Sequence, residues 1–339
     1  MKSFPFLPLA LGASLLTVLP LQADVNSDLA FSAFSNVDLQ ALAGGTVQQS
    51  RGGLINFQRG ITSQSLYVVN AAPAVVQSKL IHWNQSSHSN LKVWLHQSLP
   101  QQWTTTDFAG LGSLPDNSSV KALRDATAKF DPSNPSLQLS KEEGQMLVTT
   151  LAAAGADPFV GVWSQILSGR ISNFLNGRLG SETYVQSDGT IQPLSELKNL
   201  LHADPRIYGQ YQHLLNQTPL KAGTVATTRL APADLYYEVF DVQGEAAIGT
   251  GAIYQAASPA TIQSADIEFY DSCGIYVTAE LDQLWPVTID GRNETLVWRA
   301  DLVSAPNIAY LHGTERLASG MVMLEEVKDA IEAFRSECQ

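Results

Sequence analysis

The 339-residue chain has little cysteine, little charge and few basic residues. Its two cysteines exclude a disulfide-stapled scaffold and a multi-cysteine zinc module. Only 15% of the residues are charged and 45% are apolar, so the chain is too apolar to be disordered. The 20 basic residues are outnumbered by 32 acidic ones. This net charge of −12 argues against a nucleic-acid-binding protein, which needs a basic surface.

Recognisable catalytic motifs are also missing from the chain. It contains no G-x-S-x-G serine motif, no phosphate-binding loop and no H-E-x-x-H zinc motif. His82, His88 and His96 lie close together in the sequence, but no carboxylate cluster accompanies them. We therefore expect these histidines to be surface or core side chains rather than metal ligands, and we expect no cofactor.

The first residues resemble a secretory signal peptide. Lys2 gives a positive start, residues 4–21 are apolar with three prolines, and Ala23 offers a small residue at a cleavage point before Asp24. Residues 1–23 therefore predict an exported protein, periplasmic or extracellular. No later run approaches about 18 apolar residues, so we expect no transmembrane segment after cleavage and a soluble mature chain.

The negative charge is concentrated in the last third of the chain. Residues 231–339 carry eighteen acidic residues against five basic ones. One interpretation is a solvated, repulsive face that keeps the protein soluble. The other is a site for a cationic partner or for divalent ions. The sequence favours the first interpretation, because the acids alternate with apolar residues along the strands expected there.

The order of predicted elements divides the chain into three parts. Residues 24–45 are expected to form a flexible or weakly helical lead-in. Residues 46–95 then predict a hairpin, a helix that begins near Pro73, and a further short strand. Residues 115–220 are predominantly helical, and Ser140 with Glu143 forms a capping box at the start of one helix. The expected helices cover 118–130, 140–154, 157–174, 193–201 and 205–215.

The last third of the chain returns to strands and then ends in a long helix. The strands are expected at 235–242, 246–256, 265–270, 274–287 and 294–303. Ile267 and Phe269 alternate with Asp266 and Glu268, a pattern that predicts an antiparallel sheet with one covered and one wet face. Arg299 lies in mid-strand and is expected to form a cross-strand salt bridge with Glu280 or Asp282.

The segment that follows Pro306 predicts an amphipathic helix to about Arg335. It must bury its apolar stripe, and the nearest uncovered surface is the apolar face of the sheet. The fold class is therefore α+β: an antiparallel sheet that carries a long C-terminal helix, with a helical central region. The apolar stripe consists of Leu317, Met321, Leu324, Val327, Ile331 and Phe334.

This order resembles the START/Bet v1-like superfamily, the helix-grip or SRPBCC domains. The matching parts are S-L-Y-V-V-N-A-A-P-A-V-V-Q-S-K-L-I-H-W at Ser65–Trp83 and the strands and helix of Ala265–Arg335, together 90 of the 339 residues. In that family a strand runs into a short helix, often through a proline, as Ala72-Pro73 does here. The resemblance implies one domain at 46–339 with a helical insertion at about 115–220.

The resemblance also implies a cavity between the sheet and the C-terminal helix, which would hold a hydrophobic, lipid-like small molecule. The alternative for the residues that would line it is a solid core, because aromatic and methionine stripes usually pack. The expected ligand-binding residues are Phe269, Val277, Leu281, Trp285, Trp298, Met321 and Leu324.

Three functions remain open from the sequence. The first is an exported, non-catalytic protein that binds a hydrophobic small molecule. The second is a cyclase- or hydrolase-type enzyme on the same scaffold, which requires at least two polar side chains that converge inside the cavity. The third is an envelope or extracellular interaction protein. Separately, Cys273 and Cys338 could pair in an oxidising compartment.

Overall fold

The computed structural model describes residues 25–52, 57–153, 158–186, 189–221 and 229–338. The strands are β1 (Gln48–Arg51), β2 (Gly60–Val69), β3 (Val93–Ser98), β4 (Tyr184–Gln186), β5 (Gly189–Ile191), β6 (Asp234–Val242), β7 (Glu245–Ala257), β8 (Ile262–Asp271), β9 (Val277–Ile289) and β10 (Arg292–Ser304). The helices are α1 (Val25–Asp28), α2 (Leu39–Ala43), α3 (Pro73–Ile81), α4 (Ser118–Ala128), α5 (Lys141–Ala153), α6 (Phe159–Leu175), α7 (Pro193–Leu201), α8 (Pro205–Leu215) and α9 (Gly313–Glu337). The 3₁₀ helices include η1 (Gln85–Ser87), η2 (Ser89–Leu91), η3 (Thr105–Ser113), η4 (Leu179–Ser181) and η6 (Asn307–Tyr310). The signal peptide expected at residues 1–23 lies outside the described residues.

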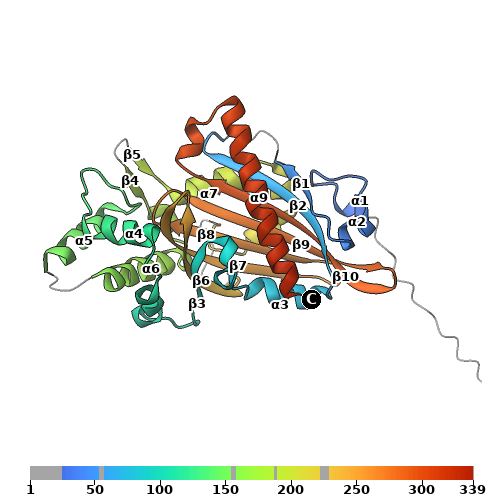
Figure 1. Cartoon of the computed structure of the whole chain (residues 1–339), viewed down its shortest axis with the longest axis horizontal. Coiled ribbons are helices and arrows are strands. Elements are labelled where there is room, and N and C mark those ends of the chain that lie inside the picture. Colours follow the sequence, from blue (N-terminus) through green and yellow to red (C-terminus); the bar gives the residue numbers. More distant parts are fainter. Residues whose placement is uncertain (1–24, 53–56, 154–157, 187–188, 222–228, 339) are drawn as a thin grey trace, which may run out of the picture.

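An eight-stranded antiparallel sheet dominates the fold, in the order β1-β2-β10-β9-β8-β7-β6-β3 (Figure 1). Two of its connections are two-residue hairpin loops, Gln243-Gly244 and Asp290-Gly291. All four of these residues have positive φ, as type I′ turns require. The predicted antiparallel sheet is confirmed. The small β4–β5 hairpin forms a separate two-stranded sheet.

Helices cover both faces of the large sheet. On one face, α9 and α3 pack against β2, β9 and β10, around Tyr67, Leu284 and Val297. On the other face, α6, α7 and α8 pack against the central strands and form the larger core. Figure 1 shows α9 lying across the front of the sheet and α7 behind it. The expected α+β class with a long C-terminal helix is confirmed.

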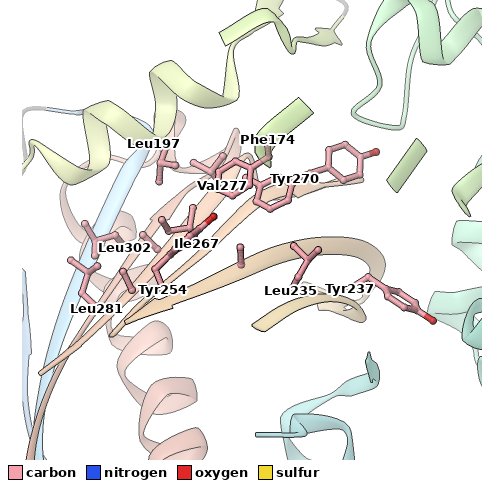
Figure 2. Packing of buried hydrophobic residues seen from close by; sticks show 14 of the residues in the cluster. Phe174, Leu197, Leu235, Tyr237, Tyr254, Ile267, Tyr270, Val277, Leu281 and Leu302 are labelled. Atoms are coloured by element: carbon pink, nitrogen blue, oxygen red, sulfur yellow. The ribbon is translucent and has the colours of Figure 1, made fainter. Parts of the chain in front are cut away.

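The apolar face of the sheet was predicted to lie against α9, but in the structure it lies on the opposite side, against the central helices. Phe269, Val277, Leu281 and Trp298 were expected to face α9, but they belong to the core on the far side. Phe269 stacks on Phe174 of α6, with 3.9 Å between ring centroids. Figure 2 shows Val277 and Leu281 on the side of the sheet that carries Leu197 of α7. The central helices therefore cover the apolar face, because they supply more apolar surface than α9 does.

The apolar stripe of α9 is shorter than predicted. Val327, Ile331 and Phe334 are buried against the sheet together with Met323. Met321 is 59% exposed and Leu317 is also exposed, because the packed part of the helix begins only at Met323. The prediction that Met321 faces the sheet is therefore wrong, and Leu324 is only partly buried.

The segment expected to be a flexible lead-in is packed on the core. Within residues 25–45 the chain forms α1 and α2, and Leu29 and Leu42 are fully buried. Phe31 meets the Trp298 ring edge-on, with 4.7 Å between ring centroids. Burial of these side chains outweighs the weak helix signal of the local sequence.

The five helices predicted in the central region are all present, as α4 to α8. Ser140 and Glu143 form the predicted capping box, since the Ser140 N–H donates to Glu143 and the Glu143 N–H donates to Ser140 Oγ. Glu143 also accepts two bonds from the buried Arg170 of α6. Among the described residues, no helix is both long enough and apolar enough to span a membrane.

The assignment of faces gives a stability prediction. Phe269→Ala removes a fully buried ring that stacks on α6, so we expect it to lower the free energy of unfolding by about 3–5 kcal/mol. The matched variant Met321→Ala removes an exposed side chain and should change it by about 0.5 kcal/mol or less. Urea unfolding of both variants measures the difference. An equal loss in the two would contradict this placement of the faces.

Candidate functional site

Eight carboxyl groups lie on the side of the sheet that carries α9, beside the apolar side chains that α9 contacts. Side chains alternate along a strand, so Asp282 and Glu280 share the face of Leu284, which packs with α9. On β6 the residues between Asp234 and Glu238 that belong to the far core are Leu235 and Tyr237. We call the following set the acidic face: Asp234, Glu238, Asp266, Glu268, Asp271, Glu280, Asp282 and Asp301.

Three of these carboxyl groups lie directly opposite one another on neighbouring strands. Glu280 of β9 pairs with Asp301 of β10 on one side and with Asp266 of β8 on the other. Directly opposed side chains lie about 5 Å apart, and like charges in that position destabilise a sheet. The arrangement therefore needs protons or counter-charges to be stable.

The acidic face is buried rather than wet. Asp271 is fully buried, and Glu268 and Asp282 are nearly so. The side chain of Glu280 is 25% exposed. Besides α9, the segment from α3 to η2 lies over this side, since Gln77 of α3 donates to Gln255 of β7 and His88 pairs with Glu337 of α9 at 2.5 Å. The interpretation as a solvated face is therefore wrong for these strand acids, while Glu325, Asp329 and Glu332 on the outer side of α9 are exposed as expected.

Arg299 is the guanidinium on this face, and it contacts two of the acids. Its Nη2 lies 2.6 Å from Glu280 and 2.5 Å from Asp301, so the expected cross-strand salt bridge with Glu280 is confirmed. Asp282 is its direct neighbour across the strands, yet Asp282 Oδ1 has no hydrogen-bond partner. Burial, and then the neighbouring Glu280, raise the pKa of Asp282 well above its ordinary value.

A second pair, Glu268 with Asp271, forms no ion pair with any basic side chain in the described part of the chain. Both Asp271 carboxyl oxygens and Glu268 Oε1 lack a hydrogen-bond donor, while Thr278 donates to Glu268 Oε2 at 3.3 Å. Burial raises the pKa of both groups well above the ordinary range, and the proximity of Asp271 raises that of Glu268 further. Two carboxyl groups in contact require a shared proton or a cation.

Glycines make room for these side chains. Gly249 lies opposite Asp271 across the β7–β8 pair, and a Cβ there would collide with Glu268 and Asp271. A Cβ at Gly251 would collide with the ring of Tyr236. The two strand glycines, which weaken a strand by themselves, are explained by this close approach.

A third group on this face contains His96, Glu238, Tyr236 and Asp266. His96 Nδ1 lies 2.9 Å from Glu238, and its ring stacks on Tyr236 with 4.8 Å between centroids. Tyr236 donates to Asp266 at 2.9 Å. Burial, and then the charge of Glu280, raise the pKa of Asp266 to about 7. Asp266 therefore exchanges its proton near neutral pH.

The residues predicted to bind a ligand are not at this site. Phe269, Val277, Leu281, Trp285 and Trp298 belong to the far core. Met321 and Leu324 lie on α9, where the Leu324 carbonyl accepts a bond from Gln49. The acidic face itself was visible as alternating acids on three successive strands. It was missed because those acids were predicted to lie on a solvent-exposed face of the sheet.

The cysteines and histidines do not form sites of their own. Cys273 and Cys338 are both free thiols, so the disulfide considered from the sequence is not formed. His88 and His96 bind different carboxylates, Glu337 and Glu238. Within the described part of the chain, no three His, Cys, Asp or Glu side chains are grouped so that they could hold a metal ion.

No family model, no curated protein and no solved structure matches the chain. The function must therefore be argued from the geometry of the acidic face.

The raised carboxyl pKa values predict how stability depends on pH. A carboxyl whose pKa is higher in the folded than in the unfolded state stabilises the fold at low pH, and that contribution is lost as the pH rises through the folded pKa. For Asp266 the loss falls between its unfolded pKa of 3.8 and about 7. We therefore expect the free energy of unfolding to fall between about pH 4 and pH 7, by at most about 1.4 kcal/mol per pH unit for each such group.

Urea unfolding at several pH values checks this expectation. Asp266→Asn should reduce the slope and raise stability at the higher pH. Asp125→Asn, a change at an exposed helix position, should leave the slope unaltered. Stability that is constant or rising over this range would contradict the assigned protonation.

Proposed function

We propose that the protein binds a small organic cation at the acidic face, and that protons occupy the carboxyl groups when the cation is absent. The observation that carries the proposal is the excess of buried carboxyl groups over cations. Among the described residues, the face holds eight carboxyl groups, and the basic side chains that form ion pairs with them are Arg299 and His96. With all ten groups ionised, its net charge would be −6, eight negative and two positive charges.

Such a charge cannot remain buried without compensation. An ionised carboxylate taken out of water costs several kcal/mol unless it is paired. The unpartnered oxygens of Glu268, Asp271 and Asp282 are therefore acceptors that await either a proton or an N–H donor. A bound cation would replace the proton, and hydrogen bonds to charged groups contribute about 1.5–3 kcal/mol each.

An organic cation fits the geometry better than a metal ion. A metal needs several ligands around one point, whereas these carboxyl groups are arranged as pairs along neighbouring strands. Ammonium or guanidinium groups carry several N–H donors and can bridge such pairs. The sequence had left a cationic partner open as the second interpretation of the acidic C-terminal third.

The scaffold proposed for this site is a helix grip. Its support is the strand order, in which β2 lies beside β10 and the chain then continues into α9 across the same face. In this proposal, α4 to α8 belong to an insertion that covers the outer face. The secretory signal expected at residues 1–23 makes the protein an exported one. The hydrophobic ligand stays a prediction, but a polar face beneath α9 favours a polar ligand.

A second function, acid–base catalysis on a bound cation, has its own observation. A general acid or base works best with a pKa near the working pH, and that of Asp266 is about 7. Its neighbour Tyr236 donates to it at 2.9 Å. Mass spectrometry of a bound amine before and after incubation distinguishes the two functions, because only catalysis changes the mass.

Titration calorimetry tests the binding function directly. The probes are methylammonium, guanidinium, putrescine and arginine, each titrated in two buffers of different protonation enthalpy. We expect at least one probe to bind below about 1 mM and to release protons as it binds. Asp282→Asn should weaken that binding about tenfold or more, since it removes an unpartnered carboxylate oxygen.

The control is Glu325→Gln, which makes the same charge change at an exposed position of α9. It should leave the affinity within about twofold. Binding that releases no protons, or that is equally weakened by both variants, would contradict the proposal, as would the failure of every probe to bind. Thermal unfolding of each variant confirms that it is folded.

A further inference from the structure

A separate cavity lies where the end of α2, the end of β2, the start of β10 and the last turns of α9 meet. Its volume is about 350 Å³, within the range of small-molecule pockets. The lining residues are Ala43, Val68, Asn70, Glu294 and Arg335. Glu294 alternates with Thr295 on β10 and shares the far face with Leu296 and Trp298, so the cavity is distinct from the acidic face.

Glu294 brings an incompletely paired carboxylate to this cavity. The residue is 1% exposed. Its Oε1 lies 3.2 Å from Arg292, but its Oε2 has no hydrogen-bond partner. A buried acceptor without a partner destabilises the fold, and more strongly when it is charged. A donor supplied by a ligand would remove this destabilisation.

Arg335 brings a positive charge to the same cavity and holds it in a fixed position. Its Nη1 donates to the Gly45 carbonyl at 2.9 Å, and its Nη2 donates to the Leu42 carbonyl at 3.0 Å. These bonds attach α9 to the C-terminal end of α2. They use two of the five N–H groups of the guanidinium, so others remain for a ligand.

The two charges line one cavity without forming an ion pair with each other. Each is held by its own neighbours, Glu294 by Arg292 and Arg335 by the α2 carbonyls. A molecule that carries both charges on a short frame matches such an arrangement. The small apolar side chains of Ala43 and Val68 complete the lining.

We propose that this cavity binds a small zwitterion of the α-amino acid class. The ammonium group donates to Glu294 Oε2, and the carboxylate accepts from the free N–H groups of Arg335. The volume is large enough for a single amino acid. The site is independent of the cation site proposed above.

Titration calorimetry with glycine, alanine and serine tests the proposal, alongside two analogues that carry one charge each, ethylammonium and propionate. We expect at least one zwitterion to bind about tenfold or more tightly than either analogue, since both charges contribute. Glu294→Gln should weaken zwitterion binding about tenfold and leave propionate binding unchanged. The matched control Glu325→Gln should alter neither.

Three results would overturn the inference. The first is that no zwitterion binds, which leaves a cavity filled by solvent only. The second is that ethylammonium binds as tightly as the zwitterions, which leaves a cation site at Glu294 alone. The third is zwitterion binding that Glu294→Gln does not weaken. Thermal unfolding keeps these results interpretable, because it identifies a variant that has lost its fold.

Discussion

The main physical constraint on this structure is the burial of like charges on the side of the sheet that carries α9. Glu280 lies between Asp301 and Asp266 on adjacent strands, and Glu268 lies beside Asp271 without an ion pair to any described basic residue. Water cannot screen charges that helices cover on this side. Protons or a bound cation must therefore neutralise them, and this requirement links the packing of the sheet to its proposed function.

The central helices decide which face of the sheet carries these charges. Phe174 of α6 stacks on Phe269, and α7 and α8 complete the cover of the apolar face. With that face occupied, α9 packs through only a short stripe, from Met323 to Phe334. The remaining surface under α9 and α3 then holds polar side chains. A large core on one side thus permits a polar site on the other.

Much of the fold could be predicted from the sequence, because the signals were local. The capping box at Ser140, the turns at Gly244 and Gly291 and the strand periodicity all act within a few residues. The candidate site could not be predicted, because alternation shows that a strand has two faces and does not show what covers each. Asp282 and Glu280 alternate with apolar residues in the same way whether water or α9 lies above them. One contact of the site, the Arg299–Glu280 salt bridge, could be predicted, because strand pairing alone brings those two residues together.

The central claim is that the acidic face holds protons in the free protein and exchanges them for a cation. Its most direct measurement is an NMR titration of the side-chain carboxyl carbons, with and without a saturating amine. The account predicts that Asp266 titrates at about 7 in the free protein, that Glu268 or Asp271 titrates higher, and that these values fall when the amine binds. If all three groups titrate at their ordinary values, near about 4, and the amine has no effect on them, the account is contradicted.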